Sequence, residues 1–125
     1  IHAQPLATIT PVATKEEVAE AAKLSRTCSV SEDVMAYMAA LCEAARNPDK
    51  VRLGPSPRAL LALMRCCQAL AAIRGRDYVI PDDVKTLAVP VLAHRLVPHG
   101  AQSMESCQRI LREILEQVSA PTETV

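Results

Sequence analysis

The six residues Gly54-Pro55-Ser56-Pro57-Arg58-Ala59 constrain the fold of this chain most, because they predict where a helix begins. Ser56 suits the N-cap position, where a serine side chain accepts a hydrogen bond from a free N–H group of the first turn. Pro57 suits the first helical position, where the missing N–H has no cost and the fixed φ favours the helix. The pattern therefore predicts a helix that begins at Pro57 and carries Arg58 in its first turn.

The residues after Arg58 continue this helix and predict its end. Apolar residues recur at helical spacing, and a glycine follows as a natural C-terminal stop. The apolar positions are Leu60, Leu61, Met64, Cys67 and Ala71, and the glycine is Gly75. A helix N-terminus attracts anions through its unpaired N–H groups and its partial positive charge. Arg58 therefore predicts a phosphate-binding tip, with an ordinary solvated or salt-bridged arginine as the alternative.

Four further segments carry helix signals of the same kind. Each begins at a capping residue or a proline and places apolar residues on one helical face. The expected helices run from the capping box at Thr14 to about Arg26, from Ser31 to near Asn47, from Pro81 through the Val84–Leu92 pattern, and from Ser103 to Val118. Pro90 lies inside the third of these and lacks an N–H donor, so we expect a kink or a break there.

These signals together predict an all-α domain of five helices. We expect Leu60, Met64, Val84, Leu87, Leu111 and Ile114 in its core, with Val34, Tyr37, Met38, Leu41, Cys42 and Ala45 as the buried stripe of the second helix. The β-prone segments 51–53 and 78–80 flank the third helix and could pair as a very short two-stranded ladder. Residues 1–13 show no periodicity and are expected to be a connector, residues 14–118 the domain, and residues 119–125 a disordered tail.

Composition limits the classes of partner. Lys plus Arg and Asp plus Glu number 14 each, so no net charge attracts the chain to nucleic acid or to an anionic membrane. Two tyrosines, Tyr37 and Tyr78, are the only aromatic residues, which leaves little surface for base stacking. No apolar run reaches the roughly 18 residues of a membrane span. The chain begins at Ile1 and not at Met, so we expect a piece of a longer protein, and the absence of a signal peptide says little about that protein.

Five cysteines, at positions 28, 42, 66, 67 and 107, are too irregular for a disulfide framework or a zinc site. None forms a Cys-x-x-Cys pair, and no histidine lies close to them in sequence. Cys42, Cys67 and Cys107 fall on apolar helical faces, where we expect them to act as small core residues. A reducing cytoplasm is the simplest location for such a chain.

Three motifs between residues 54 and 96 are informative together. They are Gly54-Pro55-Ser56-Pro57-Arg58-Ala59, Gly75-Arg76-Asp77-Tyr78-Val79-Ile80-Pro81-Asp82-Asp83-Val84-Lys85 and Leu92-Ala93-His94-Arg95-Leu96. In order and separation they resemble the C-terminal lid of MoxR-type AAA+ ATPases, and the resemblance extends from about Pro5 to Val118. It implies a five-helix lid domain, which would close over an ATPase core domain that this sequence does not contain.

The resemblance also implies roles for two residues of the first motif. The family's sensor 2 arginine, which reaches from the lid to the nucleotide phosphates, corresponds to Arg58, with Ser56 beside it in the nucleotide-binding segment. Two positions depart from the family pattern. Pro55 replaces a small residue and is expected to stiffen the turn, and Ile80 replaces a common helix-capping threonine. Neither departure removes the arginine.

The chain lacks the groups that hydrolyse ATP. All three glycines stand alone, so no phosphate-binding loop is present, and no acidic cluster suits Mg²⁺. The adjacent Asp82 and Asp83 are expected to stabilise the dipole of the helix that they begin, and not to act in acid–base chemistry. We therefore expect no ATPase activity and no bound cofactor in this chain alone, with ATP and Mg²⁺ bound by the full-length parent.

By resemblance, the partners are the protein's own AAA+ core and the neighbouring subunits of a hexameric ring, together with von Willebrand factor A-type proteins. Such rings remodel client proteins or assist metalloenzyme assembly. Two alternatives remain open from the residues: an independent helical adaptor, and a histone-like nucleic-acid-binding domain suggested by residues 76–84. The client and the roles of Arg52, Arg76, His94 and Arg95 do not follow from the sequence.

Overall fold

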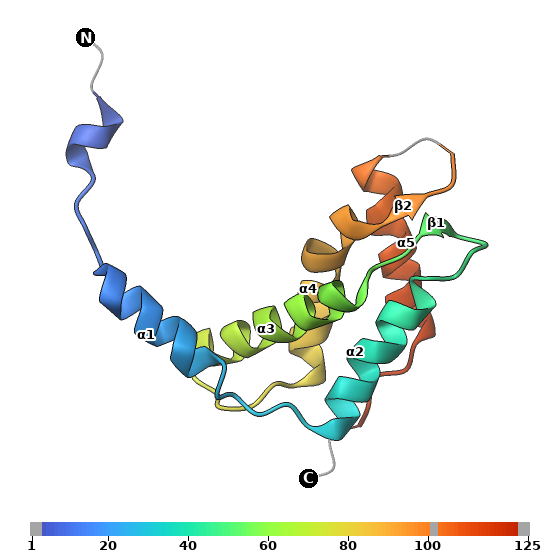
Figure 1. Ribbon diagram of the computed structural model, residues 1–125, viewed down its shortest axis with the longest axis horizontal. Helices are drawn as coiled ribbons and strands as arrows, with labels where there is room; N and C mark the ends of the chain where they lie inside the picture. The colour runs from blue at the N-terminus through green and yellow to red at the C-terminus, as the bar shows by residue number, and fades with distance from the viewer. Residues whose placement is uncertain (1–3, 101–102, 123–125) are drawn as a thin grey trace.

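Residues 4–100 and 103–122 of the chain are described in a computed structural model (Figure 1). The elements of these residues are η1 (Pro5–Thr8), α1 (Lys15–Ser25), α2 (Glu32–Ala44), β1 (Val51–Leu53), α3 (Pro57–Ile73), α4 (Pro81–Leu92), η2 (Ala93–Arg95), β2 (Val97–Pro98) and α5 (Met104–Gln117). The prediction of an all-α fold with five helices and a minimal ladder is confirmed.

The helices begin where the capping residues predict. The Thr14 hydroxyl accepts a hydrogen bond from Glu17 N at 3.0 Å, and the Glu17 carboxylate accepts one from Thr14 N, also at 3.0 Å. Ser31 and Ser103 cap α2 and α5 in the same way, at 3.2 and 3.1 Å from the backbone N–H groups three residues on. Because these bonds satisfy donors that a helix leaves free, local sequence decides the helix starts.

The core lies among α2, α3, α4 and α5, and α3 packs most extensively against α4. Every residue of the predicted α2 stripe is buried, and so are Val84, Leu111 and Ile114. Leu60, Met64 and Leu87 are only partly buried and pack against the edge of the core. Cys42, Cys67 and Cys107 lie inside it, as predicted, and all five cysteines are free.

The buried face of α3 is rotated from the predicted one. Cys67 and Ala71 are buried as expected, but Leu61 is 49% exposed. The other buried residues of the helix are Ala59, Leu63 and Gln68. The helix is apolar on almost every side, so periodicity alone does not select one face, and the contacts with α4 and α2 decide which residues are covered.

The short ladder exists, but its predicted partner is wrong. Strand β1 pairs antiparallel with β2, Val51 opposite Pro98 and Leu53 opposite Val97, and not with residues 78–80. Those residues instead bridge to Ser29, whose carbonyl accepts from Val79 N at 2.9 Å. The 17 residues of α3 span about 25 Å, so the segments before and after this helix lie at its opposite ends and cannot pair.

Of the kink or break predicted at Pro90, the break does not occur, because helix α4 continues through Pro90 to Leu92. The chain then narrows into the single 3-10 turn of η2. Pro90 and Thr86, whose carbonyl would have accepted from residue 90, are both exposed. Water can therefore satisfy that carbonyl, which makes the proline tolerable.

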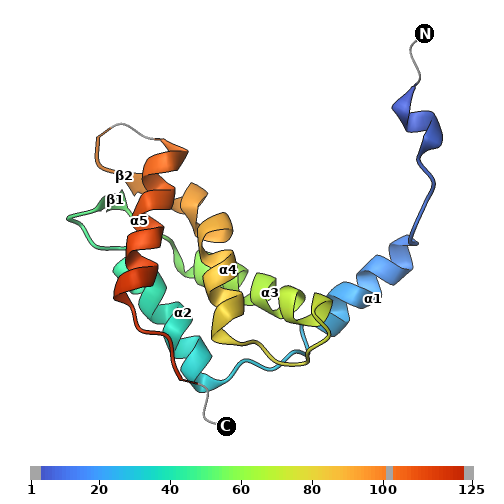
Figure 2. The same cartoon turned by 180° about the vertical axis from the view of Figure 1, so that it is seen from behind.

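The N-terminal residues extend away from the helical body, as Figures 1 and 2 show from opposite sides. Neither η1 nor α1 has a buried residue, and α1 contacts the body through α3. At the other end of the chain, residues 119–122 form no helix or strand, although Ala120 packs against the core. The remainder of the expected tail lies outside the described residues. None of the described helices is both long enough and apolar enough to cross a membrane.

Candidate functional site

The loop that leads into α3 is held tightly against the end of α2. Arg46 Nε donates a hydrogen bond to the Pro55 carbonyl at 2.9 Å, and the Pro55 side chain is fully buried. A Cβ atom on Gly54 would lie 2.7 Å from Arg46 Cα, closer than real Cβ atoms come to a neighbour. Only glycine fits this close approach, so the first motif fixes the position from which α3 starts.

Ser56 and Arg58 occupy the predicted positions at the start of α3, but one predicted contact is absent. Ser56 is the N-cap residue and Pro57 follows it, yet the Ser56 side chain makes no capping hydrogen bond. Its carbonyl instead accepts from Ala59 N at 2.9 Å. Within residues 4–100 and 103–122, no group accepts a hydrogen bond from Arg58 N. The first turn of α3 thus keeps a free backbone donor beside Arg58.

Arg58 lines a hollow of about 500 Å³ between α1 and α3. Its lining residues are Ala22, Ser25, Arg26, Arg58, Leu61, Ala62 and Arg65. The three arginines are exposed, and none of them forms an ion pair with any carboxylate of the described chain. The hollow therefore gathers unneutralised positive charge around a small apolar floor.

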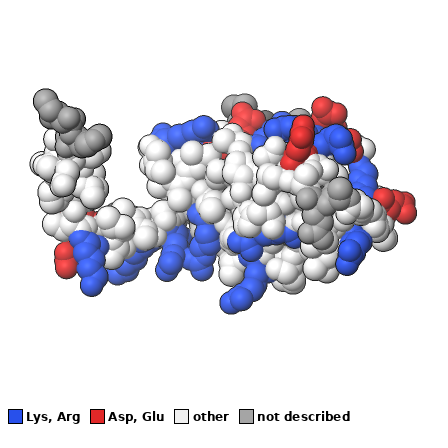
Figure 3. Space-filling view, turned by 90° about the horizontal axis from the view of Figure 1, so that it is seen from above, with Lys and Arg blue, Asp and Glu red and all other residues white. Residues whose placement is uncertain are grey.

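Gln68 fixes the α1 side of this hollow to α3. The Gln68 side chain is 7% exposed, and its Nε2 donates to the carbonyls of Arg26 at 3.3 Å and Cys28 at 2.9 Å. Arg26 is therefore held beside α3 by a buried contact. Figure 3 shows Lys and Arg side chains along the lower edge of the view, from the N-terminal arm into the body, while the upper edge and the right-hand end carry both basic and acidic side chains.

A second ionic cluster joins the end of α3 to the start of α4. Asp83 is completely buried, and its carboxylate accepts hydrogen bonds from Arg76 at 2.6 and 2.8 Å and from Ile80 N at 2.9 Å. Arg74 lies 3.6 Å from the same carboxylate. Arg76 also donates to the Tyr78 carbonyl at 2.9 Å and stacks over the Tyr78 ring. This cluster is structural, because it leaves Arg76 committed to Asp83.

The cluster gives Asp83 a larger role than the sequence predicts. Asp83 is a buried ion-pair partner and the cap of the Ile80 N–H, which is more than a favourable charge at a helix start. Burial alone raises the pKa of Asp83, but the hydrogen bonds from Arg76 and Ile80 and the charges of Arg76 and Arg74 outweigh it, so the pKa lies below its ordinary value. The hydrogen bond to Asp83 raises the pKa of Arg76.

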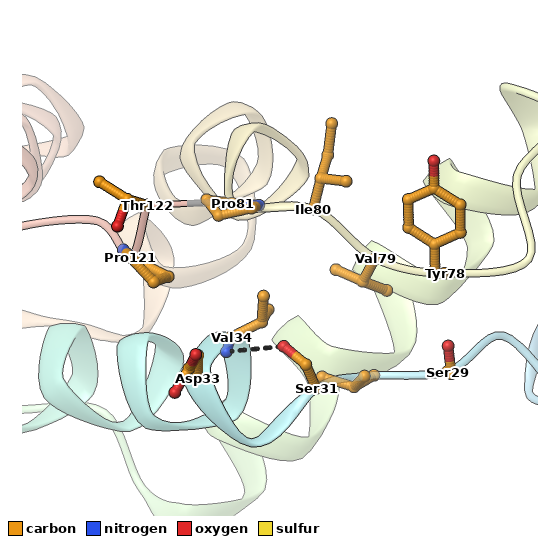
Figure 4. Close-up of a pocket in the computed structure, with 11 residues that line it drawn as sticks. Ser29, Ser31, Asp33, Val34, Tyr78, Val79, Ile80, Pro81, Pro121 and Thr122 are labelled. Carbon is orange, nitrogen blue, oxygen red and sulfur yellow. Dashed lines mark hydrogen bonds between the residues drawn. The ribbon is translucent and has the colours of Figure 1, made fainter. Parts of the chain in front are cut away.

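A second hollow, of about 570 Å³, lies between the start of α2 and residues 78–81 (Figure 4). Pro121 and Thr122 close one end of it. Its hydroxyl at Ser31 is already used to cap α2. The lining includes one carboxylate, Asp33, which makes no hydrogen bond to a hydroxyl of the lining, and it includes no basic side chain, so the hollow is not an anion site.

The other residues of the motifs carry no comparable site. No group of His, Cys, Asp and Glu in the described residues is suited to hold a metal ion. Arg52 and His94 are exposed, and Arg95 Nε donates to the Val91 carbonyl at 3.2 Å. Sequence reasoning missed Arg65 and Arg26. The seven-residue spacing from Arg58 places Arg65 on the same helical face, whereas no sequence signal brings Arg26 to it.

A protein-family comparison matches the part of the chain that contains α3 and the loop before it. Residues 43–114 match the model of the AAA lid domain family. The chain is 35% identical over 121 residues to the uncharacterized protein YeaC of Bacillus subtilis, covering 95% of this chain and 38% of that protein. It is 36% identical over 96 residues to Chaperone MoxR1 of Mycobacterium tuberculosis, covering 68% of this chain and 26% of that protein. The chain thus spans well under half the length of these relatives.

A solved structure shares the fold. The crystal structure of a candidate ATPase of Cytophaga hutchinsonii superimposes with a TM-score of 0.77 at 28% sequence identity, covering 86% of this chain and 36% of that one. The family match includes α3, the loop before it and the Arg76–Asp83 cluster. The chain belongs to the MoxR family of AAA+ ATPases and forms the lid domain of that family.

Proposed function

We propose that this lid closes over ATP bound to an AAA+ core and that Arg58 is its sensor 2 arginine. The observation that carries the proposal is the start of α3, where an exposed arginine without an acidic partner stands beside a free backbone N–H. Both groups favour an anion, and a helix N-terminus adds its dipole. Ser56, at the N-cap, belongs to the same nucleotide-facing segment.

The mechanism is differential binding between two nucleotide states. When the core holds ATP, Arg58 donates a charge-assisted hydrogen bond to a phosphate oxygen, worth about 1.5–3 kcal/mol. Loss of the γ-phosphate weakens this contact, and the lid rotates relative to the core. A ligand shifts such an equilibrium only by its difference in affinity, so one arginine shifts it about ten- to a hundredfold.

The tight loop before α3 couples Arg58 to the rest of the lid. Gly54, Pro55 and Arg46 hold the start of α3 rigidly, so a force on Arg58 moves the domain as one body. Residues 1–13 would then be the connector from the core and residues 14–118 the lid. In the parent, the core would supply the phosphate-binding loop and the Mg²⁺ site, and the ring of subunits would be hexameric.

The wider role that we propose is remodelling of client proteins or help in metalloenzyme assembly, in the cytoplasm and with von Willebrand factor A-type proteins as partners. The name of one relative, Chaperone MoxR1 of Mycobacterium tuberculosis, supports the chaperone-like role. Family membership argues against the alternatives, an independent adaptor and a histone-like domain.

Steady-state ATPase kinetics on the full-length parent tests the proposal. Arg58→Ala should lower ATP turnover at least about tenfold, because one charge-assisted bond is lost. Arg58→Lys should restore activity only in part, since an ammonium lacks the planar fork of a guanidinium. Arg112→Ala, at an exposed position of α5, is the matched control. If Arg58→Ala hydrolyses ATP like the wild type while thermal melts show an intact fold, the assignment is wrong.

A further inference from the structure

The hollow between α1 and α3 holds two arginines that a single sensor residue does not require. Arg26 and Arg65 line it together with Arg58, and no carboxylate is among the lining residues. Like charges brought together repel one another, so an anion that binds between them is favoured. The two additional arginines therefore indicate a site for an anionic ligand.

We propose that Arg26, Arg58 and Arg65 form one anion site for the polyphosphate chain of a nucleotide, with Arg26 and Arg65 adding contacts beyond the sensor arginine. The inference rests on the proposed function and deepens it. Arg58 and Arg65 are two turns apart on one face of α3, about 10 Å along its axis. Their flexible side chains can converge on one ligand from both ends of the hollow.

The third arginine is held in place by the fold. Gln68, one turn after Arg65, donates to the Arg26 carbonyl and to the Cys28 carbonyl from a buried position. Because these bonds fix the end of α1 on α3, Arg26 faces the hollow without needing a ligand to bring it there. A site organised before binding pays less entropy when the ligand arrives.

The size and the floor of the hollow favour a small phosphate compound over a protein surface. A concave volume of about 500 Å³ is within the usual range for small-molecule sites. Its floor between the arginines is apolar and includes Ala22, Ala62 and the half-exposed Leu61. Guanidinium groups around an apolar floor match a molecule with a phosphate chain and a flat ring.

The test is NMR titration of the 125-residue chain with sodium tripolyphosphate, ATP and AMP at low ionic strength. We expect binding of ATP and tripolyphosphate on the order of 1 mM, weakening as salt is added. The double variant Arg26→Gln/Arg65→Gln should weaken tripolyphosphate binding about five- to tenfold. The matched control is Arg109→Gln/Arg112→Gln, which removes the same charge from exposed positions of α5, a helix that packs against α2, α4, η2 and β2.

Equal weakening in the two double variants, or no weakening in either, would overturn the inference. If tripolyphosphate binds more tightly than ATP, the assignment of the site to a nucleotide is wrong. If neither compound binds, the proposed phosphate site is wrong, and an acidic protein surface becomes the better partner for the three arginines. The proposed function is tested separately. If Arg58→Ala leaves ATP turnover unchanged while the hollow still binds tripolyphosphate, the sensor role fails and this site remains.

Discussion

The guanidinium of Arg76 donates two hydrogen bonds to the carboxylate of Asp83, at 2.8 Å to Oδ2 and 2.6 Å to Oδ1. This bidentate pair connects the turn after α3 to the first turn of α4. Gly75 lies in the turn after α3, and its φ of +76° lets the chain reverse there. The two helices that meet most extensively in the core are thus joined at one end by an ion pair.

Arg76→Ala should destabilise the domain by about 3 kcal/mol, because it leaves a fully buried carboxylate with Arg74 as its remaining guanidinium neighbour. Urea unfolding followed by circular dichroism measures the change. The apolar double variant Arg76→Met/Asp83→Leu should recover most of the lost stability, since it removes both charges. A single variant as stable as the wild type would show that the pair contributes nothing.

The stability contributed by Asp83 should disappear in acid. Its pKa is lower in the folded chain than its ordinary value of 3.8, so the unfolded chain binds the proton more readily. The contribution is therefore fully present above about pH 4 and is lost as the pH falls through the folded pKa. Urea unfolding of the wild type and Asp83→Asn should differ constantly from about pH 5 to 7 and converge below about pH 4. If the stabilities of the two proteins instead moved apart as the pH falls, the pKa of Asp83 in the folded chain would not be lowered.

Gly54→Ala should destabilise the domain by about 1–3 kcal/mol and displace the loop before α3. The new methyl group would lie 2.7 Å from Arg46 Cα, which is backbone and cannot rotate away. Adding Arg46→Ala should therefore restore little of the lost stability, because it removes the contact with Arg46 Cγ but not the one with Arg46 Cα. Full rescue by the second substitution would show that only the side chain was crowded. Thermal melts of the single and double variants make the comparison.

One of the five thiols should react quickly in the native chain. Cys66 is exposed, whereas the other four cysteines are buried. Burial first, and then the charge of Asp83, raise the pKa of Cys67 to about 12. Labelling with Ellman's reagent should give one fast thiol, and Cys66→Ser should abolish it. Two fast thiols in the wild type would contradict the burial of the others.

The sequence by itself determined the elements of the fold and the position of one candidate residue. Capping residues satisfy the free donors of a first turn within three residues, so Thr14, Ser31 and Ser103 mark helix starts without help from the rest of the chain. Pro57 and Gly75 act through their own backbone angles. For the same local reason, Arg58 could be placed in the first turn of α3 from the sequence alone.

Only the tertiary structure decided which segments meet. Strand β1 pairs with β2 and not with residues 78–80 because the length of α3 separates its two flanking segments. The buried face of α3 depends on its neighbours, since its sequence is apolar on nearly every side. Arg26 joins Arg58 and Arg65 through the buried Gln68, a contact across 42 residues that no local pattern encodes. Helix starts are local because their hydrogen bonds are local, whereas a site shared by two helices exists only after they pack.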